Sequence, residues 1–179
     1  MRRTAQRLAV SSLFALVAAA GAPAVAGAKG CSGADSDPAS LGQPGTAHAT
    51  LCLLNRERSI RGLRKLRADG KLRSAATGHA GDMVAKHYFD HTSKSGASLV
   101  ARIKRTGWTR SRHSWTVGEN IGYGSGSLAT PREMVRAWMH SAGHRQNILA
   151  RQFKMIGVGV ANGAPTGDGG ATYATDFGG

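Results

Sequence analysis

The stretch that decides the fold is Trp138-Met-His-Ser-Ala-Gly-His-Arg-Gln-Asn-Ile-Leu149. A helix is predicted to enter it from Thr130, because Thr130-Pro131-Arg132-Glu133 is a capping box with proline at the first helical position. Apolar or small side chains then recur at helical spacing, and we expect them to form a buried stripe. This stripe consists of Met134, Ala137, Trp138 and Ser141.

His144 is the residue of this stretch best suited to a functional site. Gly143 interrupts the helical pattern directly before it, and a further short helix is expected over residues 145–150. A histidine that follows a helix-ending glycine is held on rigid scaffold but lies outside the packed face, as site residues commonly do.

Outward from this stretch, the spacing of apolar residues predicts helices first and strands late. Helices are expected over residues 47–61, 71–86 and 98–105, and strands over residues 115–121, 156–160 and 172–177. This order favours an α+β fold over parallel βαβ units. In the strand at 156–160, Gly157 and Gly159 share one face, which lets the backbone of another element approach closely.

The glycine-rich run from Gly122 to Gly126 resembles a phosphate-binding loop in composition only. It lacks the Gly-Lys-Ser/Thr ending, and its spacing departs from the dinucleotide-binding pattern. We interpret the run as a flexible connection beside the site.

The first two helices have distinct inward faces. In helix 47–61 the inward positions are Ala49, Cys52, Leu53, Ile60 and Leu63, while Asn55, Arg56, Glu57 and Arg58 lie outside. In helix 71–86 the inward positions are Leu72, Ala75, Ala76, His79, Ala80, Met83 and Val84. His79 is therefore interpreted as a core histidine. Four others are interpreted as surface or packing histidines: His48, His87, His113 and His140.

His91 has a different setting, because it follows the aromatic pair Tyr88-Phe89 and precedes a loop. The aromatic rings can anchor the backbone while the imidazole faces outward. His91 is therefore a second candidate site residue.

The N-terminus reads as a secretory signal peptide over residues 1–28. Arginines at 2, 3 and 7 precede an apolar run that ends in small residues with Ala-x-Ala cleavage sites. We expect an arm at 29–46, either disordered or tethered by a disulfide, and one domain over 47–179. The protein is predicted to be secreted, either extracellular or associated with the cell wall, with no membrane span.

The chain is strongly basic, with a formal net charge of +14. Much of the excess lies in one run: Arg56, Arg58, Arg61, Arg64, Lys65, Arg67, Lys71 and Arg73. Such a run is either a solvated helix face or a surface for anionic partners, such as phospholipid or an anionic cell-envelope polymer. No aromatic residues are interleaved with these charges, so specific nucleic-acid binding by base stacking has no support.

Two cysteines, Cys31 and Cys52, remain after the leader. In an oxidising compartment they are expected to pair and to tether the N-terminal arm to the first helix. A metal or redox role for the two cysteines is disfavoured.

Three short motifs in order resemble the CAP superfamily, the family of cysteine-rich secretory proteins, antigen 5 and plant pathogenesis-related proteins, in its bacterial secreted form. They are Tyr88-Phe89-Asp90-His91-Thr92-Ser93, Gly118-Glu119-Asn120-Ile121-Gly122 and Gly143-His144-Arg145-Gln146-Asn147-Ile148-Leu149. The tail that contains Ile156–Val160 and Tyr173–Gly178 also matches. The resemblance implies a three-layer α-β-α sandwich with a small central antiparallel sheet.

The same resemblance implies a cleft lined by two histidines and two acidic residues. His91, Glu119 and His144 match three of these four positions, and Ser141 stands where many members have an acidic residue. Two imidazoles and a carboxylate are suitable ligands for zinc or another divalent metal, with one position left open. Spacing alone does not force these residues together, and a purely structural role for each is the competing interpretation.

Two functional classes remain. The first is a secreted binding module for a lipid, a sterol or an anionic cell-envelope ligand, and Ser141 favours this class because a hydroxyl is a weak base. The second is a metal-assisted extracellular hydrolase. The zincin motif His-Glu-x-x-His and the Gly-x-Ser-x-Gly elbow are both missing from the sequence.

Overall fold

The computed structural model describes residues 30–179, so the signal peptide predicted at 1–28 lies outside the described residues. None of the helices within 30–179 is long and apolar enough to cross a membrane.

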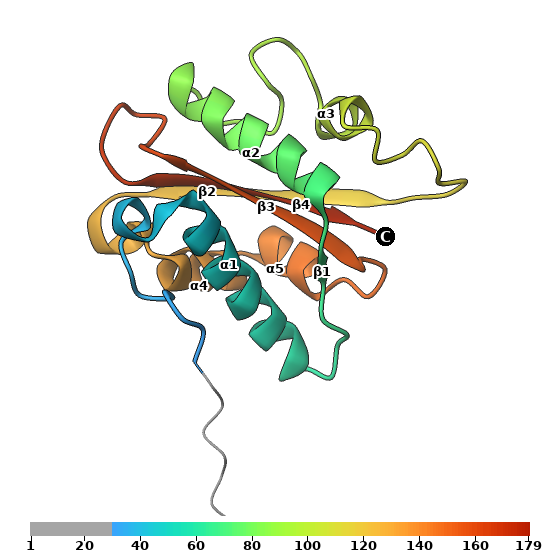
Figure 1. Ribbon diagram of the computed structural model, residues 1–179, viewed down its shortest axis with the longest axis horizontal. Coiled ribbons are helices and arrows are strands. Elements are labelled where there is room, and N and C mark those ends of the chain that lie inside the picture. The colour runs from blue at the N-terminus through green and yellow to red at the C-terminus, as the bar shows by residue number, and fades with distance from the viewer. Residues whose placement is uncertain (1–29) are drawn as a thin grey trace, which may run out of the picture.

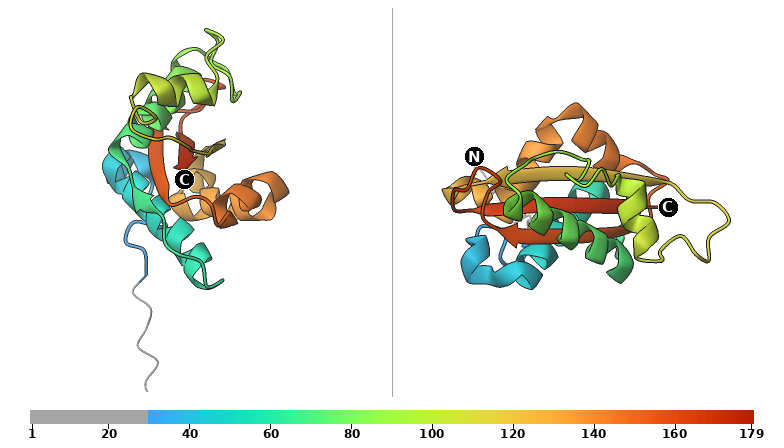
Figure 2. Two further views of the ribbon diagram at one scale, coloured as in Figure 1. Left: turned by 90° about the vertical axis from the view of Figure 1, so that its right-hand side faces the viewer. Right: turned by 90° about the horizontal axis from the view of Figure 1, so that it is seen from above.

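A four-stranded sheet lies between two layers of helices (Figures 1 and 2). The sheet has the order β1-β3-β4-β2, and α2 and α3 cover one face while α1, α4 and α5 cover the other. The elements are α1 (Pro38–Ser59), β1 (Arg67–Ala68), α2 (Gly70–Ala85), α3 (Leu99–Arg105), β2 (Val117–Gly124), the 3-10 helix η1 (Gly126–Ala129), α4 (Pro131–His140), α5 (Ala142–Leu149), β3 (Met155–Asn162) and β4 (Ala171–Gly178).

This arrangement confirms the expected α+β sandwich, with one difference in the sheet. Strands β2, β4 and β3 are antiparallel, but β1 pairs in parallel with the start of β3. The sheet is therefore mixed, because the two residues of β1 run alongside β3 before the chain turns into α2.

Helix α2 packs almost directly on the backbone of β3, as the alternating glycines predict. A Cβ atom at Gly157 would overlap the backbone nitrogen of Arg73, and one at Gly159 would overlap that of Thr77. The larger side chains of β3 point to the opposite face, where Val158 and Val160 are buried. One strand thus accepts a helix at contact distance on one face and supplies apolar core on the other.

Helix α1 differs from its prediction at both ends. It begins at Pro38 and bends at Gly42, and Ile60, expected to point inward, is 67% exposed. Arg58, expected to lie outside, is only 1% exposed, and its guanidinium donates to the carbonyls of Ile148 and Ala150 at the end of α5. These carbonyls have no partner within α5, so a buried arginine from another helix satisfies them.

The predicted helix through Trp138 ends at Ser141 and not at Gly143. Ser141 is extended (φ −100°, ψ 123°), and α5 begins directly after it with Gly143 inside its first turn. In the expected stripe, Met134 and Trp138 are buried, but Ala137 is exposed and Val135 takes an inward position instead. The bend at Ser141 changes the helix direction, so the pattern of α4 does not extend across it.

The capping box at the start of α4 forms only in part. The Thr130 hydroxyl accepts from the Glu133 N–H at 3.4 Å, as predicted, but the Glu133 carboxylate pairs with Arg136 at 3.2 Å. Glu133 therefore forms an ion pair within α4 and does not cap the start of the helix.

The glycine-rich run is partly strand, which corrects its interpretation as a flexible connection. Gly122 and Gly124 belong to β2 and are paired with Tyr173 and Ala171 of β4. A Cβ atom at Gly122 would overlap the sulfur of Met134, so glycine here permits close packing of α4.

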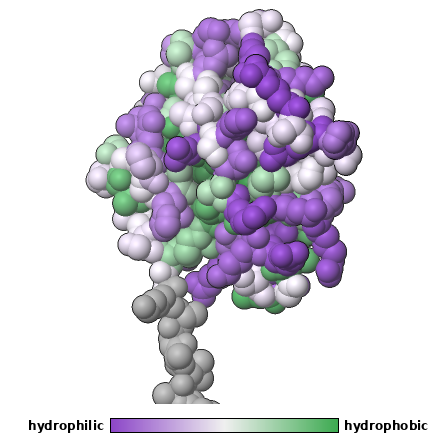
Figure 3. All heavy atoms as spheres, turned by 45° about the vertical axis from the view of Figure 1, so that its right-hand side comes forward, coloured by the Kyte–Doolittle hydropathy of each residue, from purple (hydrophilic) through white to green (hydrophobic). Residues whose placement is uncertain are grey.

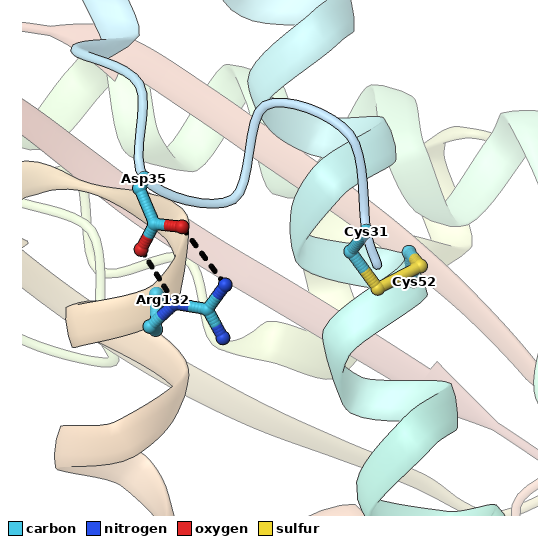
Figure 4. The surroundings of a disulfide bond; sticks show 4 residues. All are labelled: Cys31, Asp35, Cys52 and Arg132. Atoms are coloured by element: carbon cyan, nitrogen blue, oxygen red, sulfur yellow. Dashed lines mark hydrogen bonds and ion pairs between the residues drawn. A yellow bond between two sulfur atoms is a disulfide. The ribbon is translucent and has the colours of Figure 1, made fainter. Parts of the chain in front are cut away.

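The arm before α1 is held at two points (Figure 4). The predicted disulfide joins Cys31 to Cys52 of α1, with a Cα–Cα distance of 5.7 Å. Asp35 and Arg132 form a two-bonded ion pair, and the Arg132 backbone N–H also donates to the Ala34 carbonyl at 2.9 Å. The arm therefore connects α1 with the start of α4.

We predict that Gly159→Ala lowers the free energy of unfolding by roughly 1–3 kcal/mol, because its methyl group would push α2 away from β3. Gly78→Ala is the matched control, since Gly78 lies in α2 and an added methyl group there would have no atom within 4 Å. That control should stabilise the protein by up to about 1 kcal/mol through helix propensity. Urea denaturation measures both, and equal stabilities for Gly159→Ala and the parent would contradict the packing described.

Candidate functional site

The three predicted site residues come from three different elements. Glu119 lies in β2, His91 in the loop between α2 and α3, and His144 in the first turn of α5. Asn120, the neighbour of Glu119, donates to the main-chain carbonyl of His144 at 3.1 Å. The strand therefore connects the two helical layers at this edge of the sheet.

His91 and Glu119 are in direct contact. Nδ1 of His91 lies 2.7 Å from Oε1 of Glu119, and the imidazole is 56% exposed while the carboxylate is 1% exposed. A buried carboxylate thus holds one nitrogen of a half-exposed ring. When Nδ1–H donates to Glu119, the other nitrogen, Nε2, carries the lone pair and has no hydrogen-bond partner among the described residues.

Arg102 completes this cluster, and its role was not predicted from the sequence. Its Nη2 donates to Oε2 of Glu119 at 2.5 Å, and its Nη1 donates to the carbonyls of His91 and Ala97 at 2.8 and 3.0 Å. The guanidinium is buried at 5% exposure. Arg102 therefore neutralises Glu119 and also fixes the loop that carries His91.

Two more ionisable side chains lie behind the cluster. His79 of α2 is buried, as predicted, and its Nε2 lies 3.0 Å from the Asp90 carbonyl and 3.9 Å from Oε2 of Glu119. Asp176 of β4 is directly opposite Glu119 in the sheet register and fully buried. Neither oxygen of Asp176 has a hydrogen-bond donor among the described residues, so the carboxyl can bond to Glu119 only when it is protonated.

The protonation states follow from these contacts. Burial, and then the charge of Glu119, raise the pKa of Asp176 well above its usual range and favour its neutral form. Burial opposes the charge of Glu119, but the hydrogen bond from His91 and the charge of Arg102 outweigh it and lower its pKa. The hydrogen bond to Glu119 raises the pKa of His91. Burial, and then the charge of His91, lower the pKa of His144.

His144 is half-buried beside Trp138, with ring centroids 6.5 Å apart. Ser141 is half-buried at the junction of α4 and α5, and its hydroxyl makes no capping hydrogen bond to α5. Asn147 donates to the carbonyl of Glu119 and to Oδ1 of Asn120 at 3.0 and 2.9 Å. Asn147 therefore fixes α5 to β2 and is a structural amide.

Only one of the two aromatic residues before His91 is an anchor. Tyr88 donates to Asp82 at 2.6 Å, and burial together with this hydrogen bond raises the pKa of Tyr88 to about 12. Phe89 is 44% exposed and packs edge-on against Tyr123, with centroids 4.9 Å apart. An exposed aromatic pair therefore borders the part of the loop that carries His91.

The predicted metal ligands fit a divalent ion only in part. Both oxygens of Glu119 already bond to His91 and Arg102, and residues 30–179 contain no group of three His, Cys, Asp or Glu side chains placed to hold one ion. His91 and His144 each retain a ring nitrogen without a hydrogen-bond partner in the described residues. The imidazoles of His91 and His144 are thus the available metal ligands, and Glu119 orients His91 through a hydrogen bond without being free to bind the metal itself.

The sequence contained weak signals for the residues that were missed. In the helix at 98–105, Arg102 lies three residues after Leu99 and directly before Ile103, so it places a charge next to an apolar face. Asp176 lies within a strand between Thr175 and Phe177. A lone charge on an inward face indicates an internal partner, but the pattern does not identify that partner.

Comparisons with known proteins agree with this fold. A family model described as the cysteine-rich secretory protein family, CAP, matches residues 51–175. The chain is 43% identical over 107 residues to the uncharacterized protein YkwD of Bacillus subtilis, covering 60% of this chain and 39% of that protein. It is 37% identical over 110 residues to the uncharacterized membrane protein YlbC of the same organism, covering 62% of this chain and 30% of that protein. The chain thus spans less than half the length of either relative.

Solved structures show the same fold. An extracellular protein containing an SCP domain from Bacillus anthracis has a TM-score of 0.63 and 29% identity, covering 75% of this chain and 40% of that chain. An outer surface protein from Borrelia burgdorferi has a TM-score of 0.58 and 20% identity, covering 72% of this chain and 87% of that chain. The second similarity concerns the fold alone.

We predict that Arg102→Met lowers the free energy of unfolding by about 3–5 kcal/mol, because it leaves the Glu119 carboxylate buried without its counter-charge. Adding Glu119→Gln should recover part of this loss. Arg105→Met is the matched control on the same helix, since Arg105 is exposed, and its effect should be small. Denaturant titrations of these variants and the parent measure the coupling, and an Arg102→Met effect no larger than that of the control would refute the buried pair.

We further predict that His91 titrates above, and His144 below, the ordinary histidine pKa of about 6.5. Glu119→Gln should lower the pKa of His91 towards that value. The stability contributed by the His91–Glu119 pair is fully present below the unfolded-state pKa and is lost as pH rises through the raised folded-state pKa. Two-dimensional NMR of the ring protons measures both titrations; a His91 pKa that does not respond to Glu119→Gln would exclude their contact in solution.

Proposed function

This chain belongs to the cysteine-rich secretory protein (CAP) family, and we propose that it is an extracellular binding module for a lipid, a sterol or an anionic cell-envelope component. Its cleft comprises His91, Glu119, Ser141 and His144. One observation carries the proposal: a buried carboxylate holds Nδ1 of His91 at 2.7 Å, while the imidazole itself stays 56% exposed. A carboxylate behind a histidine fixes its tautomer and makes the outer nitrogen more basic, and therefore a stronger hydrogen-bond acceptor and metal ligand.

The state of Glu119 supports binding over hydrolysis. General acid–base chemistry requires a group that can exchange a proton with the substrate. Arg102 and His91 already occupy both oxygens of Glu119, and the position at Ser141 has only a hydroxyl. The cleft thus lacks an available carboxylate in the described residues, whereas its imidazoles remain available to a ligand.

In this proposal a divalent ion, such as zinc, would bind only in a ternary site, because the described residues contain no group of three metal-ligating side chains. His91 and His144 would provide two nitrogen ligands, and an anionic group of the bound molecule would supply oxygen. The ion would polarise that anionic group when bound. Burial lowers the pKa of His144 and favours its neutral, ligating form, whereas His91 must lose a proton that Glu119 helps to retain.

The expected extracellular setting agrees with the Cys31–Cys52 disulfide, because such bonds persist in oxidising compartments. The basic residues Arg64, Lys65 and Arg67 are exposed, and their charge favours an anionic partner. Arg58 does not belong to this surface, because it is buried under α5.

We predict that zinc binds the wild-type protein weakly, and that His91→Ala and His144→Ala each reduce its affinity by about tenfold or more. His113→Ala is the matched control, since this histidine is exposed in the loop before β2. Zinc affinity should fall as pH decreases through the raised pKa of His91, because protonation removes the lone pair. Isothermal titration calorimetry at several pH values measures these effects.

Equal zinc affinities for the wild type and both cleft variants would remove the metal from the proposal. The alternative function, a metal-assisted hydrolase, is tested with zinc and three substrates: peptidoglycan, lipid esters and casein. Products that are lost in His91→Ala but retained in His113→Ala would replace the binding module with an enzyme.

A further inference from the structure

The two edges of the sheet differ in how far their outward main-chain groups are hydrogen-bonded. On β2, the outward carbonyl of Glu119 accepts from Asn147 at 3.0 Å and that of Ile121 accepts from Trp138 at 3.0 Å. Side chains of α5 and α4 therefore satisfy two outward carbonyls of this edge. The opposite edge, formed by β3, is covered only at its beginning.

The pairing of β1 shows which groups of β3 point to that edge. The Asp69 N–H donates to the Ile156 carbonyl at 2.9 Å, so the main chain of Ile156 faces away from β4. Alternate residues of an antiparallel strand face the same side, so the main chains of Val158 and Val160 face the edge as well. Strand β1 ends at Ala68, and within residues 30–179 no hydrogen bond is made to the outward N–H and carbonyl groups of Val158 and Val160.

A groove of about 540 Å³ lies along this uncovered edge. Strand β3 forms its floor, α1 supplies Ala47 and Leu51 on one wall, and α2 supplies Arg73 and Thr77 on the other. In Figure 1 the edge of β3 lies between α2 above and α1 below, and Figure 3 shows apolar side chains between polar regions on this side of the molecule. The groove thus combines unpaired main-chain groups with an apolar wall and a basic wall.

We propose that this groove binds an extended peptide with alternating apolar and acidic residues as an additional strand beside β3. Main-chain pairing with Val158 and Val160 would supply affinity, as in other cases of strand addition. Alternate side chains of a strand point to opposite faces, so one set would meet Ala47 and Leu51 and the other set Arg73.

The charge of the rim favours acidic residues in the second set. Arg67 and Arg73 are exposed and have no carboxylate partner in the described part of the chain. Asp69, the acidic residue that lines the groove, is already bonded to the N–H groups of Lys71, Leu72 and the Trp108 ring. The positive charges therefore remain available to a peptide. This site is independent of the cleft at Glu119, which lies on the opposite edge of the sheet.

Fluorescence anisotropy with labelled acetyl-Val-Glu-Val-Glu-Val-Glu-amide tests the proposal. Two isomers that carry N-methyl groups on alternate residues provide the sharpest comparison, because only one set of amides faces β3. We expect one isomer to lose binding and the other to retain it. Equal binding by both isomers, or no binding by the parent peptide, would overturn strand addition.

Two protein variants locate the site. Arg73→Glu should weaken binding by about three- to tenfold through the loss and reversal of an exposed charge. Arg105→Glu changes the net charge equally but lies on α3, so it should have little effect. Val158→Pro should abolish binding while the protein stays folded by circular dichroism, because the lost N–H faces the groove and not β4.

Other occupants would give different results. A dimer in sedimentation velocity that Val158→Pro dissociates would assign the edge to a second copy of this chain and overturn the peptide. If palmitate displaces the labelled peptide and Val158→Pro abolishes direct palmitate binding, the groove belongs to an acyl chain. That result would also overturn the peptide proposal. Loss of binding in Arg73→Glu alone among the charge variants, with one active N-methyl isomer, would establish the peptide site.

Discussion

The buried ion pair between Arg102 and Glu119 is the interaction on which the organisation of the site depends. Removing two charges from water costs several kcal/mol per ion, so the pair is tolerated only when its other bonding positions are satisfied. Arg102 meets this condition in part, because its Nη1 also donates to the carbonyls of His91 and Ala97, whereas its buried Nε has no partner among the described residues; Glu119 meets it by bonding to His91. The hydrogen bonds that compensate the buried pair therefore also fix the loop and orient the imidazole of His91.

Much of the fold could be predicted from local patterns. The alternation of glycine with valine and isoleucine in β3 indicated that the backbone of another element approaches closely, and the apolar stripe of α2 correctly placed His79 in the core. Both features depend on a strict period within one element. Such periods are visible in a single sequence because geometry imposes them on neighbouring residues.

The residues that were missed depend on contacts between distant segments. Arg58 and Arg102 are charged and would ordinarily be exposed, yet each is buried because carbonyl groups from other elements converge on its guanidinium. Gly143 was interpreted as a helix end, but the chain bends at Ser141, where no sequence pattern marks it. The neutral form of Asp176 is favoured by what surrounds it in the sheet, and this environment exists only after folding.

The order of strands in the sheet also constrains how the chain can fold. The two inner strands, β3 and β4, are the last elements of the sequence, and β1 can pair only after β3 has formed, although most of the domain separates them in sequence. Apart from the local β3–β4 hairpin, strand pairing therefore requires closure of long loops, which costs chain entropy before the pairing can compensate for it. High contact order of this kind slows folding, so helices formed early have no sheet to pack on until the C-terminal hairpin arrives. The polypeptide consequently remains open for most of its synthesis, a state compatible with passage through an export channel before folding.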